Sequence, residues 1–166
     1  MKTTIILLTS LALSINAFSQ KLVKTYYDYS KTKLQAEYYT DAYGKMVGTF
    51  KGYSEYGGIL LQGSYQDGAP IGKWIENYPD GKPHFIKIYD SPGIRLEVNN
   101  GKIIEYYANG SRSEKNYKNQ ELDGDYKFYD ENGKILREGK YVNGVLILSE
   151  ESQRIYDEEQ EKLKKQ

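Results

Sequence analysis

Cysteine is absent from this sequence of 166 residues, histidine occurs once, proline occurs four times, and neither sign of charge predominates. Without cysteine the chain forms no disulfide and carries no lipid on a thiol, so secondary structure alone must stabilise an exported form. Basic and acidic side chains number 23 each, which leaves no net positive charge for nucleic acid. The composition therefore excludes a disulfide-stabilised scaffold and a lipoprotein, and it argues against a nucleic-acid partner.

Groups that support catalysis or metal binding are also scarce. His84, the single histidine, follows a turn proline and is expected to be a surface or hydrogen-bonded residue of a strand. The chain has no Gly-x-Ser-x-Gly nucleophile motif and no glycine-rich phosphate loop. The acidic stretch near the C-terminus fails as a calcium loop, because alignment on Gly133 places Phe128 and Gly139 at the first and last ligand positions. We therefore expect no catalytic residue, no metal and no cofactor.

Residues 1–20 differ in character from the rest of the chain. One lysine precedes an apolar run that is too short to span a membrane with such flanks, and small residues at 15–17 and 17–19 offer cleavage sites. This pattern is typical of a secretory signal peptide; the alternative is a buried N-terminal helix or strand. We expect a mature chain that starts near Phe18 or Lys21, does not span the membrane, and is periplasmic or secreted.

Tyrosine and glycine are abundant, with 18 and 16 residues, and they recur in a fixed frame. Glycines nine residues apart mark four units: Gly48 and Gly57, Gly72 and Gly81, Gly101 and Gly110, and Gly124 and Gly133. The second glycine of each unit, Gly57, Gly81, Gly110 or Gly133, is assigned to a turn. Seven dipeptides in all predict hairpin turns, because both of their positions tolerate positive φ: Asp67-Gly68, Asp80-Gly81, Asn100-Gly101, Asn109-Gly110, Asp123-Gly124, Asn132-Gly133 and Asn143-Gly144.

Large side chains occupy three further positions of each unit. A bulky residue two positions after the first glycine is assigned to the core: Phe50, Trp74, Ile103 and Tyr126. A tyrosine after the second glycine is assigned to the same structural core: Tyr65, Tyr89, Tyr117 and Tyr141. A third row precedes the turns and is a candidate binding surface, with core and exposed placements left open: Tyr53, Tyr78, Tyr107 and Tyr129. Gly63 and Gly139 are expected to give room to the rings of Tyr65 and Tyr141, two residues further on.

Together these patterns predict an all-β fold, an elongated antiparallel meander of repeated β-hairpins with a short C-terminal helix. Residues 21–47 are interpreted as a degenerate capping half-repeat in which Lys31 stands where a glycine is expected. Four hairpin repeats follow at 48–148, and 149–166 form a charged helix with Ser149 as its N-cap. Acid-before-base pairs are expected along this helix: Glu150 with Arg154, Glu158 with Lys162, and Glu161 with Lys165.

The segments "GKWIENYPDGK" and "GKIIEYYANGSRSEKNYKNQELDGDYKFYDENGKILREGKYVNG" resemble the MORN-repeat variant of bacterial proteins. The resemblance extends over about Gly48 to Gly144. It implies an elongated antiparallel sheet without known catalysis, and MORN repeats are associated with protein and lipid contacts. Many proteins with this variant carry a YwqK-type antitoxin label; an exported copy requires a toxin in the same compartment.

The leading functional hypothesis is a non-catalytic, exported protein that binds a protein partner through its tyrosine-rich sheet. Three alternatives stay open. The chain neutralises a toxin as an antitoxin or immunity-type protein, it binds an envelope glycan by stacking sugars on aromatic rings, or it is a structural component of the envelope.

Overall fold

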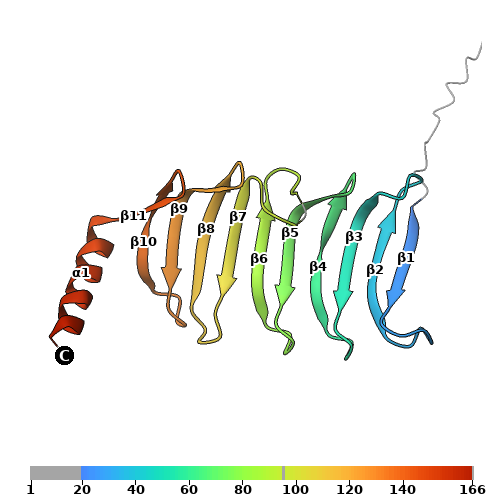
Figure 1. Cartoon of the computed structure of the whole chain (residues 1–166), viewed down its shortest axis with the longest axis horizontal. Helices are drawn as coiled ribbons and strands as arrows, with labels where there is room; N and C mark the ends of the chain where they lie inside the picture. The colour runs from blue at the N-terminus through green and yellow to red at the C-terminus, as the bar shows by residue number, and fades with distance from the viewer. Residues whose placement is uncertain (1–19, 95, 166) are drawn as a thin grey trace, which may run out of the picture.

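Along the described residues, eleven strands pair in the order in which they follow one another, so the sheet is one antiparallel meander (Figure 1). The structure is a computed structural model that describes residues 20–94 and 96–165; residues 1–19 of the predicted signal peptide lie outside the described residues. The strands are β1 (Lys21–Tyr26), β2 (Leu34–Thr40), β3 (Met46–Tyr53), β4 (Ile59–Gln66), β5 (Ala69–Asn77), β6 (Pro83–Tyr89), β7 (Gly101–Tyr106), β8 (Arg112–Lys118), β9 (Glu121–Tyr129), β10 (Ile135–Val142) and β11 (Val145–Leu148), and helix α1 (Glu150–Lys164) follows them. The predicted all-β hairpin meander with a C-terminal helix is confirmed.

The second glycine of each unit forms the turn inside a hairpin. Each has a positive φ and donates its N–H to the carbonyl three residues earlier, of Ser54, Tyr78, Tyr107 or Asp130. Residues 21–40 form a complete hairpin of their own. In its turn Lys31 has a φ of 57° and donates its N–H to the Asp28 carbonyl at 3.2 Å, so a lysine holds the left-handed conformation that glycine holds elsewhere.

The first glycine of a unit has a different use, in a β-bulge. The pairing register shifts at Gly48, Gly72 and Gly124, which all have positive φ. In each unit the first glycine is also the cross-strand partner of that unit's second-row tyrosine: Gly48 with Tyr65, Gly72 with Tyr89, Gly101 with Tyr117, and Gly124 with Tyr141. The repeated spacing between the first glycine and this tyrosine therefore arises because the two residues lie opposite each other on neighbouring strands.

Two of the seven predicted turns are wrong, because the glycine in each is the first glycine of a unit and lies in a strand. Asp123-Gly124 lies inside β9 at its bulge, and Gly101 begins β7. The hairpin turn between β8 and β9 is formed instead by Asn119 and Gln120, whose φ angles are 52° and 68°. Asparagine tolerates this conformation, whereas a glutamine in it carries no sequence signal for a turn.

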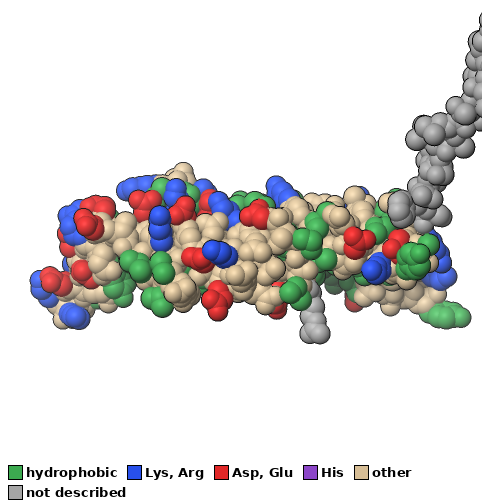
Figure 2. All heavy atoms as spheres, turned by 90° about the horizontal axis from the view of Figure 1, so that it is seen from above, with side chains coloured by type: hydrophobic (Ala, Val, Ile, Leu, Met, Phe, Trp, Pro, Cys, Tyr) green, Lys and Arg blue, Asp and Glu red, His purple; other side chains and the backbone are tan. Residues whose placement is uncertain are grey.

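Side chains on one face of the sheet, the core face, make the hydrophobic core. Trp74 is 1% exposed, and Tyr89 and Val98 are also buried. Val98 belongs to the connection between β6 and β7, which crosses this face and accepts a hydrogen bond from Tyr89 Oη at the Leu96 carbonyl, at 2.7 Å. On the opposite face, the open face, none of the described strand side chains is buried. Seen along the strands, from the turns at one end of them, the molecule is long and narrow, with acidic and basic side chains interspersed along it (Figure 2).

Gly63 makes room for a ring, but not for the ring expected. The side chain that lies against its backbone is Trp74 of the neighbouring strand, and Tyr65 packs edge-on against Trp74 at 4.9 Å. Gly139 differs, because a side chain there would meet the backbone of Ile147 in β11 and not the ring of Tyr141. The sequence thus indicated correctly that a side chain is not tolerated at these two positions. The atoms that leave no room for one belong to adjacent strands, which the sequence alone does not identify.

Helix α1 lies beside the end of the sheet (Figure 1). Strand β11 pairs with β10 only over Gly139–Val142, and the helix continues along the remainder of β10, where Ser152 Oγ accepts the Glu138 N–H at 2.9 Å. Ser149 caps the helix by accepting the Ser152 N–H. Of the expected ion pairs, Glu161 with Lys165 is present, whereas Arg154 pairs with Glu151 and Glu158. Among the described residues, no helix is both long and apolar enough to cross a membrane.

Candidate functional site: a tyrosine-lined groove

The four candidate binding tyrosines occupy two different structural positions. Tyr53 and Tyr129 are the last residues of β3 and β9, whereas Tyr78 and Tyr107 are the first turn residues after β5 and β7. The difference follows from spacing, because the first pair lies five residues after the first glycine and the second pair six. One sequence row therefore gives two sets of rings.

The structure brings Tyr78 and Tyr107 together in a groove between two neighbouring turns, those of hairpins β5–β6 and β7–β8. The groove has a volume of about 570 Å³. Its lining is mostly aromatic and proline side chains, with charged groups beside them: Tyr78, Pro79, Asp80, Lys82, Pro83, Tyr106, Tyr107, Ala108 and Gly110. Hence we call it the tyrosine groove.

Contacts within the sheet fix the position of the Tyr78 ring. Its hydroxyl donates to the Tyr106 carbonyl at 3.0 Å, which ties the turn of one hairpin to the last residue of the next hairpin's first strand. The ring stacks on His84 with 4.2 Å between centroids, and His84 Nδ1 lies 3.6 Å from Glu76 Oε1. The single histidine is thus a structural residue of β6 whose ring packs against that of Tyr78.

Tyr107 is held in a similar way by polar groups of the core face. Its hydroxyl donates to Glu105 Oε2 at 2.9 Å and lies 3.3 Å from Ser113 Oγ, a group that is almost fully buried. Glu105 also accepts from Lys115 Nζ at 3.3 Å. Burial lowers the pKa of Lys115, but its attraction to Tyr107 and Glu105 exceeds this effect, so the net shift is upward. With both groove hydroxyls engaged in the sheet, the rings and prolines are what the groove presents to a ligand.

Tyr53 and Tyr129 lie outside the groove, and their rings are engaged on the open face. Tyr53 Oη donates to Glu37 Oε1 at 2.7 Å; burial, together with this carboxylate, raises the pKa of Tyr53 to about 12. The guanidinium of Arg112 lies over the Tyr129 ring, 3.7 Å from its centroid. These two tyrosines therefore contact the sheet itself and serve below as controls.

Residues 122–143 match the family model described as the MORN repeat variant. The match covers almost the whole of hairpin β9–β10, and the hairpins at 46–66, 69–89 and 101–118 repeat its glycine frame. A search of curated proteins found no match to the chain. MORN repeats are generally non-catalytic modules that bind proteins or membranes. The match is therefore consistent with a binding role.

The residues assigned to the structural core lie on the core face of these four hairpins. The bulky row Phe50, Trp74, Ile103 and Tyr126 and the tyrosine row Tyr65, Tyr89, Tyr117 and Tyr141 share that face by register. Burial raises the pKa of several of these tyrosines, and that of Tyr89 reaches about 12. Exposure decreases most strongly around Trp74, where the β6–β7 connection covers the sheet.

The most exposed tyrosines were missed by the sequence analysis. Tyr29, Tyr43 and Tyr56 are between 90% and 103% exposed, at the tips of turns. Tyr43 and Tyr56 directly precede the turn glycines Gly44 and Gly57, a position whose side chain points into solvent. That adjacency was a usable signal, but it lies outside the repeated rows.

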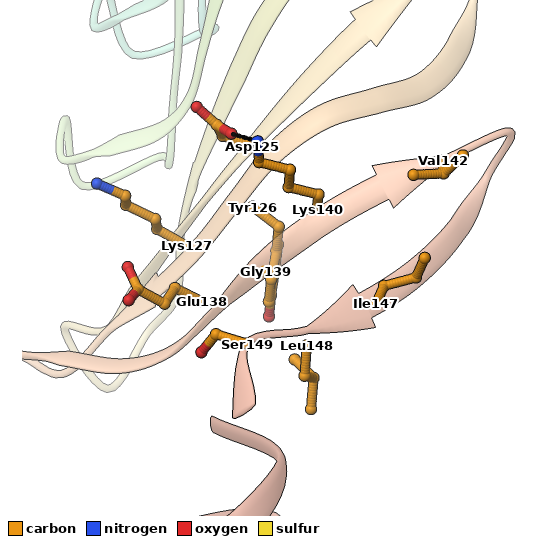
Figure 3. Close-up of a pocket in the computed structure, with 10 residues that line it drawn as sticks. All are labelled: Asp125, Tyr126, Lys127, Glu138, Gly139, Lys140, Val142, Ile147, Leu148 and Ser149. Atoms are coloured by element: carbon orange, nitrogen blue, oxygen red, sulfur yellow. Dashed lines mark ion pairs between the residues drawn. The ribbon is translucent and has the colours of Figure 1, made fainter. Parts of the chain in front are cut away.

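A second hollow lies at the C-terminal end of the open face, with a volume of about 500 Å³. Its polar part alternates in charge: Asp125 and Lys140 lie 4.0 Å apart, and Lys127 and Glu138 project beside each other (Figure 3). The exposed apolar side chains Val142 and Ile147 line its other end. Within residues 20–94 and 96–165, no three side chains of His, Cys, Asp or Glu gather as metal ligands would.

Proposed function

We propose that this protein is an exported, non-catalytic repeat protein that binds an extended segment of a protein partner in the tyrosine groove. The observation that carries the proposal is the convergence of Tyr78 and Tyr107, from two successive hairpins, with Pro79 and Pro83 in one concave site. Concave, mostly apolar sites with a few polar groups are typical of ligand binding.

The groove favours a particular kind of segment. Aromatic and proline side chains form its walls, and grooves lined by aromatic rings bind proline-rich or apolar extended peptides, which lose little entropy on binding. Asp80 and Lys82 beside the groove supply both signs of charge, so they favour no strongly charged ligand. Because each hydroxyl is already hydrogen-bonded, the rings are held in place before the ligand arrives, which lowers the entropic cost of binding.

Export rests on residues 1–20, whose composition is that of a signal peptide. A partner would then be a periplasmic, surface or secreted protein. Toxin neutralisation is one form of this proposal, in which the bound segment belongs to a toxin in the same compartment.

Affinity capture tests the proposal. The purified protein is exposed to envelope and secreted fractions of its own source, and bound proteins are identified by mass spectrometry. The double variant Tyr78→Ala/Tyr107→Ala should lose a stoichiometric partner, while Tyr78→Phe/Tyr107→Phe, which keeps both rings, should retain most of the binding.

The matched control is Tyr53→Ala/Tyr129→Ala, which removes the same number of rings from the open face. Circular dichroism establishes that each variant is folded. Equal loss of the partner in both alanine variants would refute the groove as the site. Retention of envelope polysaccharide in affinity gels, without any protein partner, would replace the proposal by glycan binding.

A further inference from the structure

One row of side chains crosses ten strands of the open face in continuous register. From β1 to β10 it reads Lys24, Glu37, Lys51, Gln62, Ile75, Ile86, Ile104, Glu114, Lys127 and Glu138. We call this row the ladder. Three isoleucines form its centre, and charges of alternating sign form both ends.

The ladder lies on the face that no described element covers. Glu37 and Lys51 form an ion pair at 3.8 Å, and Figure 3 shows Lys127 and Glu138 projecting on one side of β9 and β10. Neither addition to the sheet covers this face: the β6–β7 connection packs on Tyr89 of the core face, and α1 lies along the β10 edge, where its Glu159 pairs with Arg137 of the core face. The central isoleucines are only partly buried, so their apolar surface remains in contact with water.

The order of charges reverses sign about the centre of the ladder. When the ladder is read backwards, every charged position meets the opposite charge: Lys24 meets Glu138, Glu37 meets Lys127, and Lys51 meets Glu114. The same reversal brings Ile75 to Ile86. A surface with this property is complementary to a second copy of itself.

We propose that two copies of this chain associate open face to open face, related by a two-fold axis that runs parallel to the strands between Ile75 and Ile86. Strand β1 of one copy then lies opposite β10 of the other. The isoleucines form a shared apolar layer, as in sheets that pack face to face about 10 Å apart. Each charge contact occurs twice, because the interface is isologous.

The charges select this arrangement over its neighbours. A slip by one strand places Lys24 against Lys127 and Glu37 against Glu114. The opposite slip places Glu37 against Glu138 and Lys51 against Lys127. A two-fold axis along the ladder would place each charge against its own copy. Like charges directly opposite each other oppose association, so both one-strand slips and an axis along the ladder are disfavoured. A slip by two strands has no like-charge contact, but it keeps one kind of opposite-charge contact, Lys24 with Glu114 or Lys51 with Glu138, in place of three.

The available area is sufficient for a stable dimer. Ten strands spaced by about 4.8 Å, each contributing about 17 Å of its length, give roughly 800 Å² for each copy. Interfaces of stable complexes bury about 800 Å² for each partner. Because Tyr107 and Tyr78 are fixed by groups of the turns and the core face, the tyrosine groove stays accessible in this dimer.

Charge reversal at the two ends of the ladder tests the proposal. Lys24 and Glu138 are both exposed, so Lys24→Glu and Glu138→Lys change charge without disturbing the core. Sedimentation equilibrium of the purified protein at low salt should show a monomer–dimer equilibrium. Each single variant should dissociate more readily, by on the order of tenfold, because two attractions become two repulsions.

An equimolar mixture of the two variants gives the decisive result. In a mixed dimer the glutamate introduced at position 24 of one copy faces the lysine introduced at position 138 of the other. The unchanged Glu138 of the first copy faces the unchanged Lys24 of the second, so association should return to that of the original protein. Lys45→Glu and Glu131→Lys, at turn tips, are matched controls and should have no effect. Ile86→Lys should abolish the dimer while the chain stays folded by circular dichroism.

A monomer at every concentration overturns the proposal. So does a dimer that the single reversals leave unchanged, or one that the mixture fails to restore, since either result means pairing through another surface such as the β1 edge. Capture of a partner by the tyrosine groove is measured separately, and its failure would leave the dimer result standing.

Discussion

Replacing Gly63 by alanine should destabilise the sheet, because the added methyl group would occupy the space of a buried ring. The new Cβ would lie 2.5 Å from Trp74 Cγ and overlap the indole ring. That ring has nowhere to go, because Tyr65 packs on it at 4.9 Å, Phe50 at 5.7 Å, and its Nε1 donates to the Ser64 carbonyl at 3.1 Å. Overpacking and partial loss of this hydrogen bond together should cost about 3 kcal/mol.

Trp74 is the sole tryptophan, so its fluorescence reports this site alone. Urea denaturation of Gly63→Ala should show a lower midpoint and a red-shifted native emission. Gly58→Ala is the control, because its Cβ meets only Ser54 Oγ, at 3.5 Å. In a Trp74→Leu background, followed by circular dichroism, the added methyl group should cost less than about 1 kcal/mol, since the obstacle has been removed. A Gly63→Ala protein as stable as the original, with unchanged emission, would refute this account of the core.

Three further changes have defined outcomes. Lys31→Gly should raise the free energy of unfolding by about 0.5–1 kcal/mol in urea denaturation, because a left-handed lysine is strained, whereas the control Gly57→Ala should lower it. Burial raises the pKa of folded Tyr89 to about 12 from 10.0, so its contribution to stability is complete below pH 10 and is lost as pH rises toward 12. In a thermal-shift series the melting temperature of Tyr89→Phe should therefore fall less steeply at alkaline pH than that of the original protein. An identical fall would contradict the assignment. Ser152→Ala leaves the Glu138 N–H without its acceptor and should loosen α1, seen as faster amide exchange of Glu138 while β4 stays protected; unchanged exchange would count against the contact.

The repeat frame was readable from the sequence because it encodes backbone geometry. A turn that requires positive φ selects glycine whatever surrounds it, so Gly57, Gly81, Gly110 and Gly133 indicated the hairpins and their order. The same signal misled at Gly124, because a β-bulge also requires positive φ. A dipeptide reveals a backbone conformation, but it does not reveal whether the chain reverses there or continues.

The candidate site was readable only in part. Tyr78 and Tyr107 were selected with Tyr53 and Tyr129 because all four precede a turn. Their separation into two sets depends on one residue of spacing, and a strand reverses the direction of its side chains with each residue. The groove itself needs Pro79 and Pro83, whose positions beside the next hairpin follow from strand pairing across the sheet.

The ladder could not have been read from the sequence. Residues of alternating charge and apolar type occur throughout the chain, and bulges shift the register within most hairpins. At Gly48, Gly72 and Gly124 the register shifts by two residues, so each residue keeps its face but lies opposite a different residue of the neighbouring strand. Only the pairings, taken strand by strand, place Lys24 and Glu138 on one line.

The single-layer sheet separates the two proposed interactions physically. Each strand contacts chiefly its neighbours in the sheet, as in other repeat arrays, so a change in one hairpin has little effect on distant ones. The tyrosine groove needs two adjacent turns and should survive changes at either end of the sheet. The ladder depends on ten strands in register, because its charge pairs join β1 to β10. Deletion of one unit, such as residues 48–71 between successive first glycines, would leave the tyrosine groove intact but remove Lys51 and Gln62 from the ladder. In the dimer Glu114 would then lie opposite Ile75 instead of Lys51, so a charge contact would be lost and association should weaken. Partner binding thus depends on local geometry, whereas self-association depends on the number of repeats.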